Sequence, residues 1–206
     1  MAQNNELIAI EAQHNIHIQR LAAQLGNQAV PFIETVQGKI SARLEREVGK
    51  NLTPVRRKKL LQDIELIVTK EFSEYTATVR QANAELGLYE IGFQAKTVDS
   101  LADDIETMLA TKSVINNRAK NTLIKLGEGS YTTYNKMLTN FTALNAEQIA
   151  NIVGAGFVSG QSTRAIASTV MDEVGGKLLG TRKQAMTVAI TGTNHYANQA
   201  RMQYIE

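Results

Sequence analysis

Residues 54–86 read PVRRKKLLQDIELIVTKEFSEYTATVRQANAEL, and this stretch decides the fold class. Its apolar side chains recur every three or four positions, which is the period of one face of an α-helix. Thr53 and Pro54 mark its start, because a threonine side chain accepts a hydrogen bond from a free helical amide and a proline suits the first helical position. The pattern predicts one amphipathic helix, roughly 50 Å long at a rise of 1.5 Å per residue.

The same helical period continues toward the N-terminus. Apolar residues at helical spacing predict a helix over 5–25, and Gly26 follows it where a C-terminal cap is expected. A second helix is expected over 31–48, ending at Gly49. These segments have charged and polar residues on the face opposite the apolar stripe, which is typical of helices that pack against a neighbour.

The C-terminal half is interrupted by glycines. Beyond Gly87 we expect shorter helices, separated by glycine-rich turns at 127–130 and 154–156. No strand-like alternation of apolar and polar residues is visible. The final third predicts a helix, a flexible joint and a terminal helix, at residues 162–174, 175–176 and 178–204.

Together these segments predict an all-α fold: an extended helical protein with long antiparallel helices and a smaller C-terminal helical domain. Only two prolines, Pro31 and Pro54, interrupt the chain, so long helices are permitted almost everywhere. Aromatic residues make up only 5% of the chain, so small and aliphatic side chains must provide most of the helix packing. The expected division is a long-helix region over 1–96, a linker or short helix over 97–112 and a helical domain over 113–206.

Composition excludes several classes of protein. The chain has no cysteine, which excludes disulfides, thiolate metal sites and thiol nucleophiles. Its 22 basic and 20 acidic residues give a net charge of +2, too balanced to predict nucleic-acid binding from the total. We find no secretory signal and no apolar run near the ~20 residues of a membrane span, so we expect no membrane partner.

No motif predicts a metal site or an enzyme. Glu11, His14 and His17 lie three residues apart on the first expected helix, but a zinc site needs a tighter pair and further ligands. The Gly175-Gly176-Lys177 stretch lacks the Ser or Thr and the upstream glycine of a phosphate loop, and the glycines of 154–160 follow no strand. No nucleophile, base and acid form a recognisable catalytic set, so we predict a non-enzyme without cofactors.

A local basic cluster offers one binding surface. It has a local excess of five positive charges over Glu45 and Glu47, and consists of Arg43, Arg46, Lys50, Arg56, Arg57, Lys58 and Lys59. Three interpretations stay open: contacts to DNA phosphates, contacts to an acidic protein surface, or a solvated helix end. A helical nucleic-acid-binding module is therefore the alternative function.

The terminal segment offers a second surface. Thr191, Asn194, Asn198 and Arg201 are three, four or seven residues apart, so they share one helix face. Such a polar face forms hydrogen bonds either across a subunit contact or within the fold. We predict these four residues as partner-binding candidates.

This C-terminal region resembles one family. Gly160-Gln161-Ser162 leads into a helix, and a small-residue stretch then carries Thr191 and, seven residues later, Asn198, followed by Ala200-Arg201. The pattern is similar to the C-terminal signature of phage head morphogenesis proteins, the minor head family typified by the F protein of phage Mu. The family has an acidic residue after the threonine where this chain has Gly192.

The resemblance implies a structural virion component acting near the portal. Its implied partners are portal and other capsid proteins, with packaged DNA as a further contact, and its implied roles are capsid assembly and DNA packaging or ejection. It also implies a location at the capsid interior or portal vertex, after assembly in the host cytoplasm, and an oligomeric arrangement in the virion.

Overall fold

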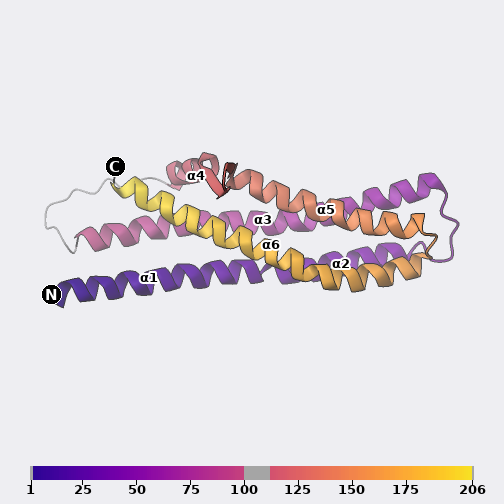
Figure 1. The fold of residues 1–206 in the computed structure, drawn as a ribbon, viewed down its shortest axis with the longest axis horizontal. Helices are drawn as coiled ribbons and strands as arrows, with labels where there is room; N and C mark the ends of the chain where they lie inside the picture. The colour runs from indigo at the N-terminus through magenta and orange to yellow at the C-terminus, as the bar shows by residue number, and fades with distance from the viewer. Residues whose placement is uncertain (1, 100–111, 206) are drawn as a thin grey trace. The chain divides into compact units, whose positions relative to one another are not determined.

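The computed structural model describes residues 2–99 and 112–205, and it confirms the all-α class. Figure 1 shows the elements in chain order. The helices are α1 (Ala2–Asn27), α2 (Ala29–Glu45), α3 (Pro54–Asp99), α4 (Lys112–Asn121), α5 (Tyr134–Val158) and α6 (Thr163–Ile205). One two-stranded antiparallel sheet lies between α4 and α5, formed by β1 (Leu123–Gly127) and β2 (Ser130–Thr133).

The chain divides into two compact units. Unit 1 takes residues 1–26, 78–137 and 186–206, and unit 2 takes residues 27–77 and 138–185. Each unit therefore draws on segments that are far apart in sequence. The expected division into 1–96, 97–112 and 113–206 follows chain order; it stays a prediction, and most of its linker lies outside the described residues.

Unit 2 is built from parts of α2, α3, α5 and α6. Ion pairs of Lys39 with Glu71 and of Arg43 with Asp63 show that α2 and α3 run antiparallel, because the higher-numbered residue of α2 meets the lower-numbered residue of α3. The contacts between α5 and α6 follow the same order, with higher-numbered residues of α5 against lower-numbered residues of α6, so these two helices are also antiparallel. The buried side chains at the centre include Ile40, Leu44, Leu60, Ile64, Val68, Phe72, Tyr75, Leu138 and Phe141.

Unit 1 packs α1 against the second half of α3 and the end of α6. His14 meets Glu90 while Ile18 packs with Leu86, so α1 and α3 are antiparallel. Where α3 and α6 contact each other, a higher residue number in α3 meets a higher residue number in α6, so these two helices are parallel. The buried side chains include Ala22, Val79, Leu86, Ile91, Tyr134, Val188, Tyr196 and Ala200.

The predicted start of α3 is correct, whereas α2 ends at Glu45, four residues before the predicted stop at Gly49. Helix α3 begins at Pro54, where the Thr53 hydroxyl accepts a hydrogen bond from the Arg56 amide at 3.4 Å. Gly49 follows α2 with a φ of 76°, a left-handed conformation that glycine adopts without steric cost. The start of α3 and the turn after α2 therefore follow from local backbone chemistry.

Two predicted breaks are wrong, because the helices continue through the glycines. α3 runs past Gly87 to Asp99, and α6 is one helix through Gly175 and Gly176, whereas α1 does end near Gly26, at Asn27. A glycine inside a helix costs only about 1 kcal/mol relative to alanine, and burial of the helix face outweighs that. Gly26 also serves packing, since an added Cβ there would lie 2.9 Å from the Met186 Cα atom.

The turn expected at 154–156 lies later in the chain, after Val158. Residues 154–156 are helical, and α5 ends at Val158. The helix closes with a Schellman motif, in which the Gln161 amide donates to the Gly156 carbonyl and the Gly160 amide donates to the Phe157 carbonyl. Gly160 has a φ of 74°, so this glycine, rather than the earlier ones, ends the helix.

The expectation of no strand is also wrong. β1 and β2 pair with Leu123 opposite Thr133 and Lys125 opposite Tyr131, and the register shifts between Lys125 and Gly127. Gly129 makes the turn with a φ of 69°. The strands, of five and four residues, are too short to show a clear alternation of apolar and polar side chains, and the glycines of 127–130 lie at a turn between strands rather than between helices.

Candidate functional site

The four predicted partner-binding residues of α6 have different environments. Thr191 and Asn194 are half-buried, and the Asn194 side chain accepts a hydrogen bond from Gln19 of α1 at 3.4 Å. Asn198 is exposed. Arg201 turns inward to α3. The structure therefore uses two of the four within unit 1 and leaves Asn198 open to solvent.

Arg201 contacts a buried carboxylate. Its Nε atom donates to Glu90 Oε1 at 2.5 Å, and its Nη2 atom donates to Asn15 at 3.1 Å. The Glu90 side chain is 0% exposed, whereas that of Arg201 is 30% exposed. An ionised carboxylate can remain in such a place only when donors surround it. Arg201 supplies both a positive charge and a hydrogen bond.

Two further donors complete the surroundings of Glu90. His14 Nε2 lies 2.6 Å from Glu90 Oε2, and Gln94 donates to Oε1 at 3.1 Å. Because the ionised carboxylate only accepts, we assign Nε2 as the donor nitrogen of His14. The His14 ring also stacks on Phe93, with centroids 3.5 Å apart and planes 2° apart. Glu90 thereby joins α1, α3 and α6.

His14 therefore has a structural partner. His17, three residues on, is exposed and tilts against Tyr89 with ring centroids 5.4 Å apart. Across the described residues, no three or more His, Asp or Glu side chains are grouped so that they could hold a metal ion.

A second buried polar layer lies about two helical turns from Glu90 along α3. The Tyr134 hydroxyl accepts a hydrogen bond from Asn83 at 2.8 Å, and Thr193 donates to the Asn83 side-chain oxygen at 3.0 Å. All three residues are buried, and Tyr134 is 0% exposed. The Tyr134 ring lies directly over Gly192, so an added Cβ would overlap it. The ring thus occupies the space that the acidic residue of the resembled family would need.

Helix α4 is held against α6 by polar contacts. His195 Nε2 donates to the Ala119 carbonyl at 2.8 Å, and the Tyr196 hydroxyl donates to Asn116 at 3.1 Å. Burial lowers the pKa of His195, partly opposed by the Ala119 hydrogen bond. Burial also raises the pKa of Tyr196, partly opposed by the charge of Arg80.

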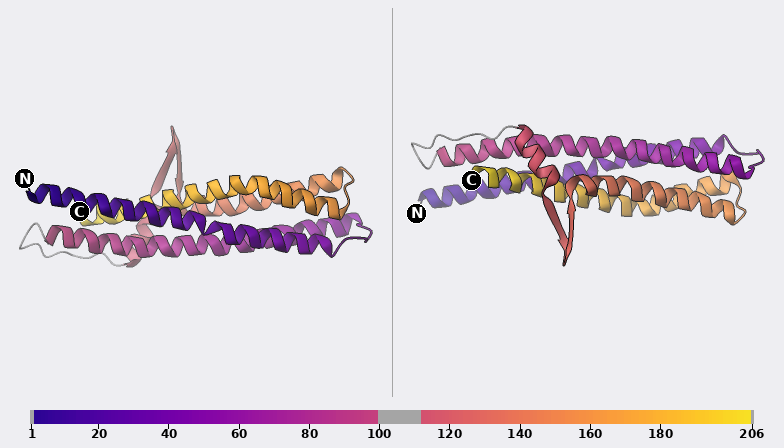
Figure 2. Two further views of the ribbon diagram at one scale, coloured as in Figure 1. Left: turned by 90° about the horizontal axis from the view of Figure 1, so that it is seen from below. Right: turned by 90° about the horizontal axis from the view of Figure 1, so that it is seen from above.

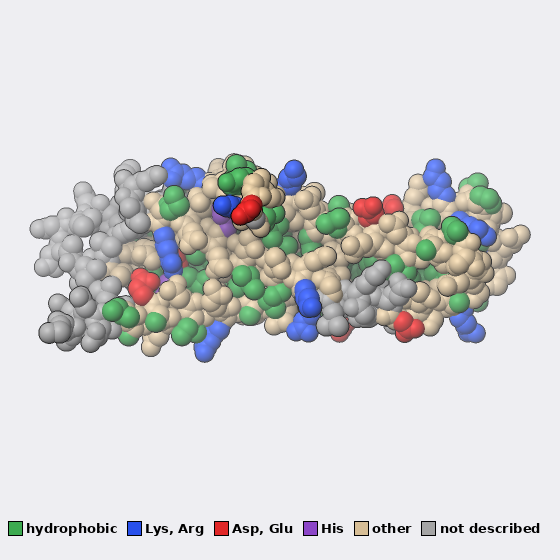
Figure 3. All heavy atoms as spheres, viewed as in Figure 1, with side chains coloured by type: hydrophobic (Ala, Val, Ile, Leu, Met, Phe, Trp, Pro, Cys, Tyr) green, Lys and Arg blue, Asp and Glu red, His purple; other side chains and the backbone are tan. Residues whose placement is uncertain are grey.

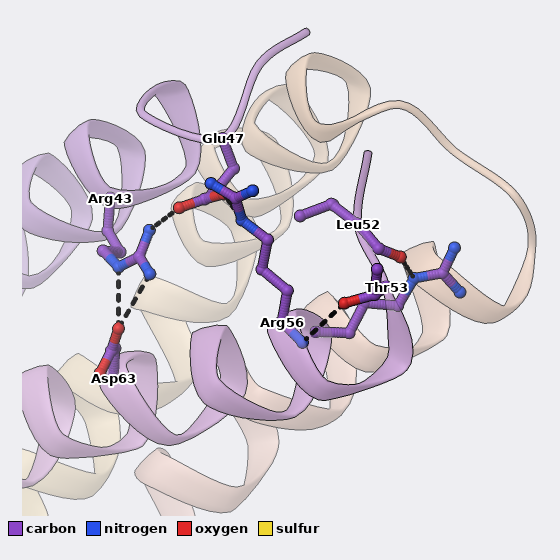
Figure 4. A network of polar contacts seen from close by, with 7 residues as sticks. Arg43, Glu47, Leu52, Thr53, Arg56 and Asp63 are labelled. Carbon is purple, nitrogen blue, oxygen red and sulfur yellow. Dashed lines mark hydrogen bonds and ion pairs between the residues drawn. The ribbon is translucent and has the colours of Figure 1, made fainter. Parts of the chain in front are cut away.

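The basic cluster is only partly available for binding (Figure 4). Arg43 donates to Glu47 at 2.8 Å and to Asp63 at 2.9 Å and 3.0 Å, and Arg56 donates to the other Glu47 oxygen at 2.7 Å. Glu47 is 5% exposed, so two guanidinium groups converge on one buried carboxylate. Arg43 and Arg56 therefore stabilise the turn between α2 and α3.

Arg57 is also engaged. Its Nε atom donates to the Leu52 carbonyl at 3.0 Å, and its guanidinium carbon lies 5.8 Å from the Phe157 ring centroid, within cation–π range. Five cluster cations are exposed, namely Arg57 itself and Arg46, Lys50, Lys58 and Lys59. On the face drawn in Figure 3, the Lys and Arg side chains are scattered, mostly singly, among uncharged ones.

We expect Glu47 to make the stability of the chain depend on pH. The hydrogen bond from Arg43, followed by the charge and hydrogen bond of Arg56, lowers the pKa of Glu47 below its ordinary value of 4.5 despite burial. Its contribution to the free energy of unfolding is thus present above the unfolded-state pKa and is lost as the pH falls through the folded-state pKa.

Urea unfolding of the wild type and of Glu47→Gln, from about pH 7 to about pH 3, measures this effect. The wild type should be the more stable of the two at neutral pH, and the difference should shrink on acidification. A difference that stays constant with pH would contradict the assignment. Comparison of the two chains removes the contribution of the other carboxylates.

Sequence reasoning missed Glu90 and Asn83, although a signal existed. The apolar stripe of α3 runs through Tyr75, Val79 and Leu86. Asn83 and Glu90 fall on the same stripe, four residues after Val79 and four residues after Leu86. A polar residue in an apolar stripe is a candidate for a buried polar contact. Because the helix predicted from the sequence ends before Gly87, Glu90 lies outside the predicted apolar stripe.

Two surface pockets lie in unit 2. One, of about 550 Å³, lies between α5 and α6 and is lined by Gln148, Asn151, Ile152, Ala155, Gly156, Ser159, Gln161 and Thr169. The other, of about 610 Å³, lies between α2 and α6 and is lined by Ser41, Glu45, Val48, Arg164, Ala167 and Ser168. Neither lining combines a nucleophile with a base and an orienting acid.

No helix among the described residues is long and apolar enough to cross a membrane. No family model, curated protein or solved structure matches the chain.

Proposed function

We propose that the chain is a non-enzymatic phage minor head protein that acts near the portal in capsid assembly and in DNA packaging or ejection. The carrying observation is the resemblance of its C-terminal segment to the Mu F-like family, together with the local structure of the matching residues. Gly160 ends α5 in a left-handed conformation. The Ser162 hydroxyl accepts a hydrogen bond from the Ala165 amide at 3.2 Å, so this Gly-Xaa-Ser step starts a helix, as the resemblance requires.

The environment of Asn198 supports a partner contact on this face of α6. Asn194 and Arg201 contact α1 and α3, which orient this face of α6. Asn198 is exposed, and no hydrogen bond to its side chain is present within the described chain. A polar side chain presented on a well-packed helix is suited to hydrogen bonding across a subunit contact.

The experiment is a pull-down of the tagged full chain from phage-producing cells, followed by mass spectrometry of the bound proteins and of purified virions. We expect portal and capsid proteins to be recovered with the chain, and the chain to be present in virions. Asn198→Glu should lower incorporation by about tenfold, which corresponds to about 1.4 kcal/mol of binding free energy. Asn140→Glu, an exposed change on α5, is the matched control and should have no effect. Absence from virions would overturn the proposal.

The alternative, a nucleic-acid-binding module, is favoured only by the exposed cations of the basic cluster. It predicts an affinity for DNA that falls steeply with salt, because each phosphate contact releases counterions. Replacing Arg46, Lys50, Lys58 and Lys59 with Ser leaves the Arg43–Glu47–Arg56 network intact and should abolish such binding. DNA binding that is unchanged in this variant would exclude the alternative. Loss of DNA binding in this variant, together with absence of the wild-type chain from virions, would establish the alternative.

A further inference from the structure

The hairpin of β1 and β2 has an outward apolar face. Residues directly opposite each other in an antiparallel pair place their side chains on the same face of the sheet. Leu123, Lys125 and Tyr131 therefore share one face, and Ile124 and Thr132 share the other. Thr132 is buried and Ile124 is half-buried, whereas Leu123 is 62% exposed and Tyr131 is 58% exposed. The second face contacts the rest of unit 1, and the first faces solvent.

The hairpin is also an incomplete sheet. It has only two strands, so each strand has one edge of backbone amides and carbonyls with no strand beside it. Figure 2 shows both strands projecting from the helices of unit 1. An isolated two-stranded hairpin is marginally stable in water, and an open edge is a template for pairing with another chain.

The two edges are not equivalent. At the end of β2 the chain turns into α5, where the Thr133 hydroxyl accepts a hydrogen bond from the Lys136 amide and caps that helix. The β1 edge has Leu123 and Lys125 on its outward face, and Leu126, 55% exposed, at the register shift. An added strand beside β1 would meet an apolar side chain and a cation two residues apart.

The local charge indicates which kind of partner would bind beside β1. Between residues 112 and 146 the sequence has five Lys or Arg and a single acidic residue, Glu128. Lys120 and Lys136 flank the base of the hairpin, and Lys125 is exposed on it. A second copy of the chain would bring the same positive charges together, and three exposed side chains cannot provide the ~800 Å² per partner of a stable dimer. A short acidic segment satisfies both constraints.

We propose that the β1 edge binds an extended acidic segment of a partner protein by strand addition. Backbone hydrogen bonds along β1 supply affinity, while Leu123 and Lys125 select an apolar and an acidic side chain at alternate positions. The proposal stands on the hairpin alone and holds whether or not the chain is a head protein.

The test uses fluorescence polarisation of the full chain with a labelled eight-residue peptide, the Glu–Val peptide, in which every second residue is alternately Val and Glu and the residues between are Ser, so that Val and Glu share one face. Two matched probes have the same length: one has Lys in place of Glu, and one is the Glu–Val peptide with alternate backbone nitrogens methylated, which removes its edge hydrogen bonds. We expect binding of the first probe only. Lys125→Glu should weaken it about tenfold, and Lys70→Glu, an exposed charge reversal on α3, should leave it unchanged.

Each other outcome overturns the proposal. Equal binding of the methylated peptide would mean charge attraction without strand addition, and no binding of the Glu–Val peptide would mean that the edge does not take acidic strands. Self-association in sedimentation that Lys125→Glu alters would assign the edge to a second copy. Tighter binding of a labelled oligothymidylate, lost in the same variant, would assign the hairpin to nucleic acid.

Discussion

Gly192→Ala should destabilise the chain by about 1–3 kcal/mol, the usual cost of forcing extra volume into a packed site. The new Cβ would overlap the Tyr134 ring. That ring is fully buried and is held by the Asn83 hydrogen bond at 2.8 Å, so it cannot move aside without loss of that bond. Urea unfolding at neutral pH measures the effect as a lower midpoint with an unchanged slope.

The matched control is Gly92→Ala. Gly92 is inside α3, and an added Cβ there would meet nothing within 4 Å. The same change should therefore stabilise the chain by about 0.5–1 kcal/mol, because alanine is the better helix former. Opposite signs at the two sites are the expected result. If both variants gain stability, Tyr134 does not pack over Gly192 as described.

Arg201→Met should destabilise the chain by about 3–5 kcal/mol, the usual cost of leaving a buried charge without its partner. Glu90 is 0% exposed and would retain only the His14 and Gln94 contacts. The double change Glu90→Leu with Arg201→Met should recover most of that loss, because apolar residues can replace a buried ion pair at little net cost. Urea unfolding of the single and double variants yields the coupling free energy.

Arg182→Met is the control for Arg201→Met on the same helix. Arg182 donates to Asn27 at 2.8 Å, but this contact is exposed, so its loss should cost less than about 0.5 kcal/mol. A double variant no more stable than Arg201→Met alone would show that Glu90 is not what makes Arg201 necessary.

Local signals predicted the ends of helices where one residue is decisive. Thr53 and Pro54 start α3, and Gly49 adopts a positive φ after α2, because capping and left-handed backbone are properties of a few neighbouring residues. The same logic failed at Gly87 and at Gly175-Gly176, where the helices continue. Whether a glycine ends a helix or continues it depends on what packs against it, and local sequence does not contain that information.

The candidate site was likewise predictable from the sequence only in part. The helical spacing of Asn194, Asn198 and Arg201 placed them correctly on one helix, but spacing could not show that Arg201 turns inward while Asn198 faces solvent. The partner of Arg201 is Glu90, more than a hundred positions earlier in the chain. In the basic cluster, the sequence suggested seven binding cations, yet the buried carboxylate of Glu47 engages two of them.

The sequence by itself determined the helical class, the start of α3 and the chemical types of the surface residues, because these follow from side-chain period, capping and charge along a local stretch. Only the tertiary structure decided which polar groups are buried, why residue 192 must lack a side chain and which cations remain open to solvent. Those outcomes depend on residues brought together from distant parts of the chain, where the low polarity of the interior makes each unpaired charge or overlapping atom costly.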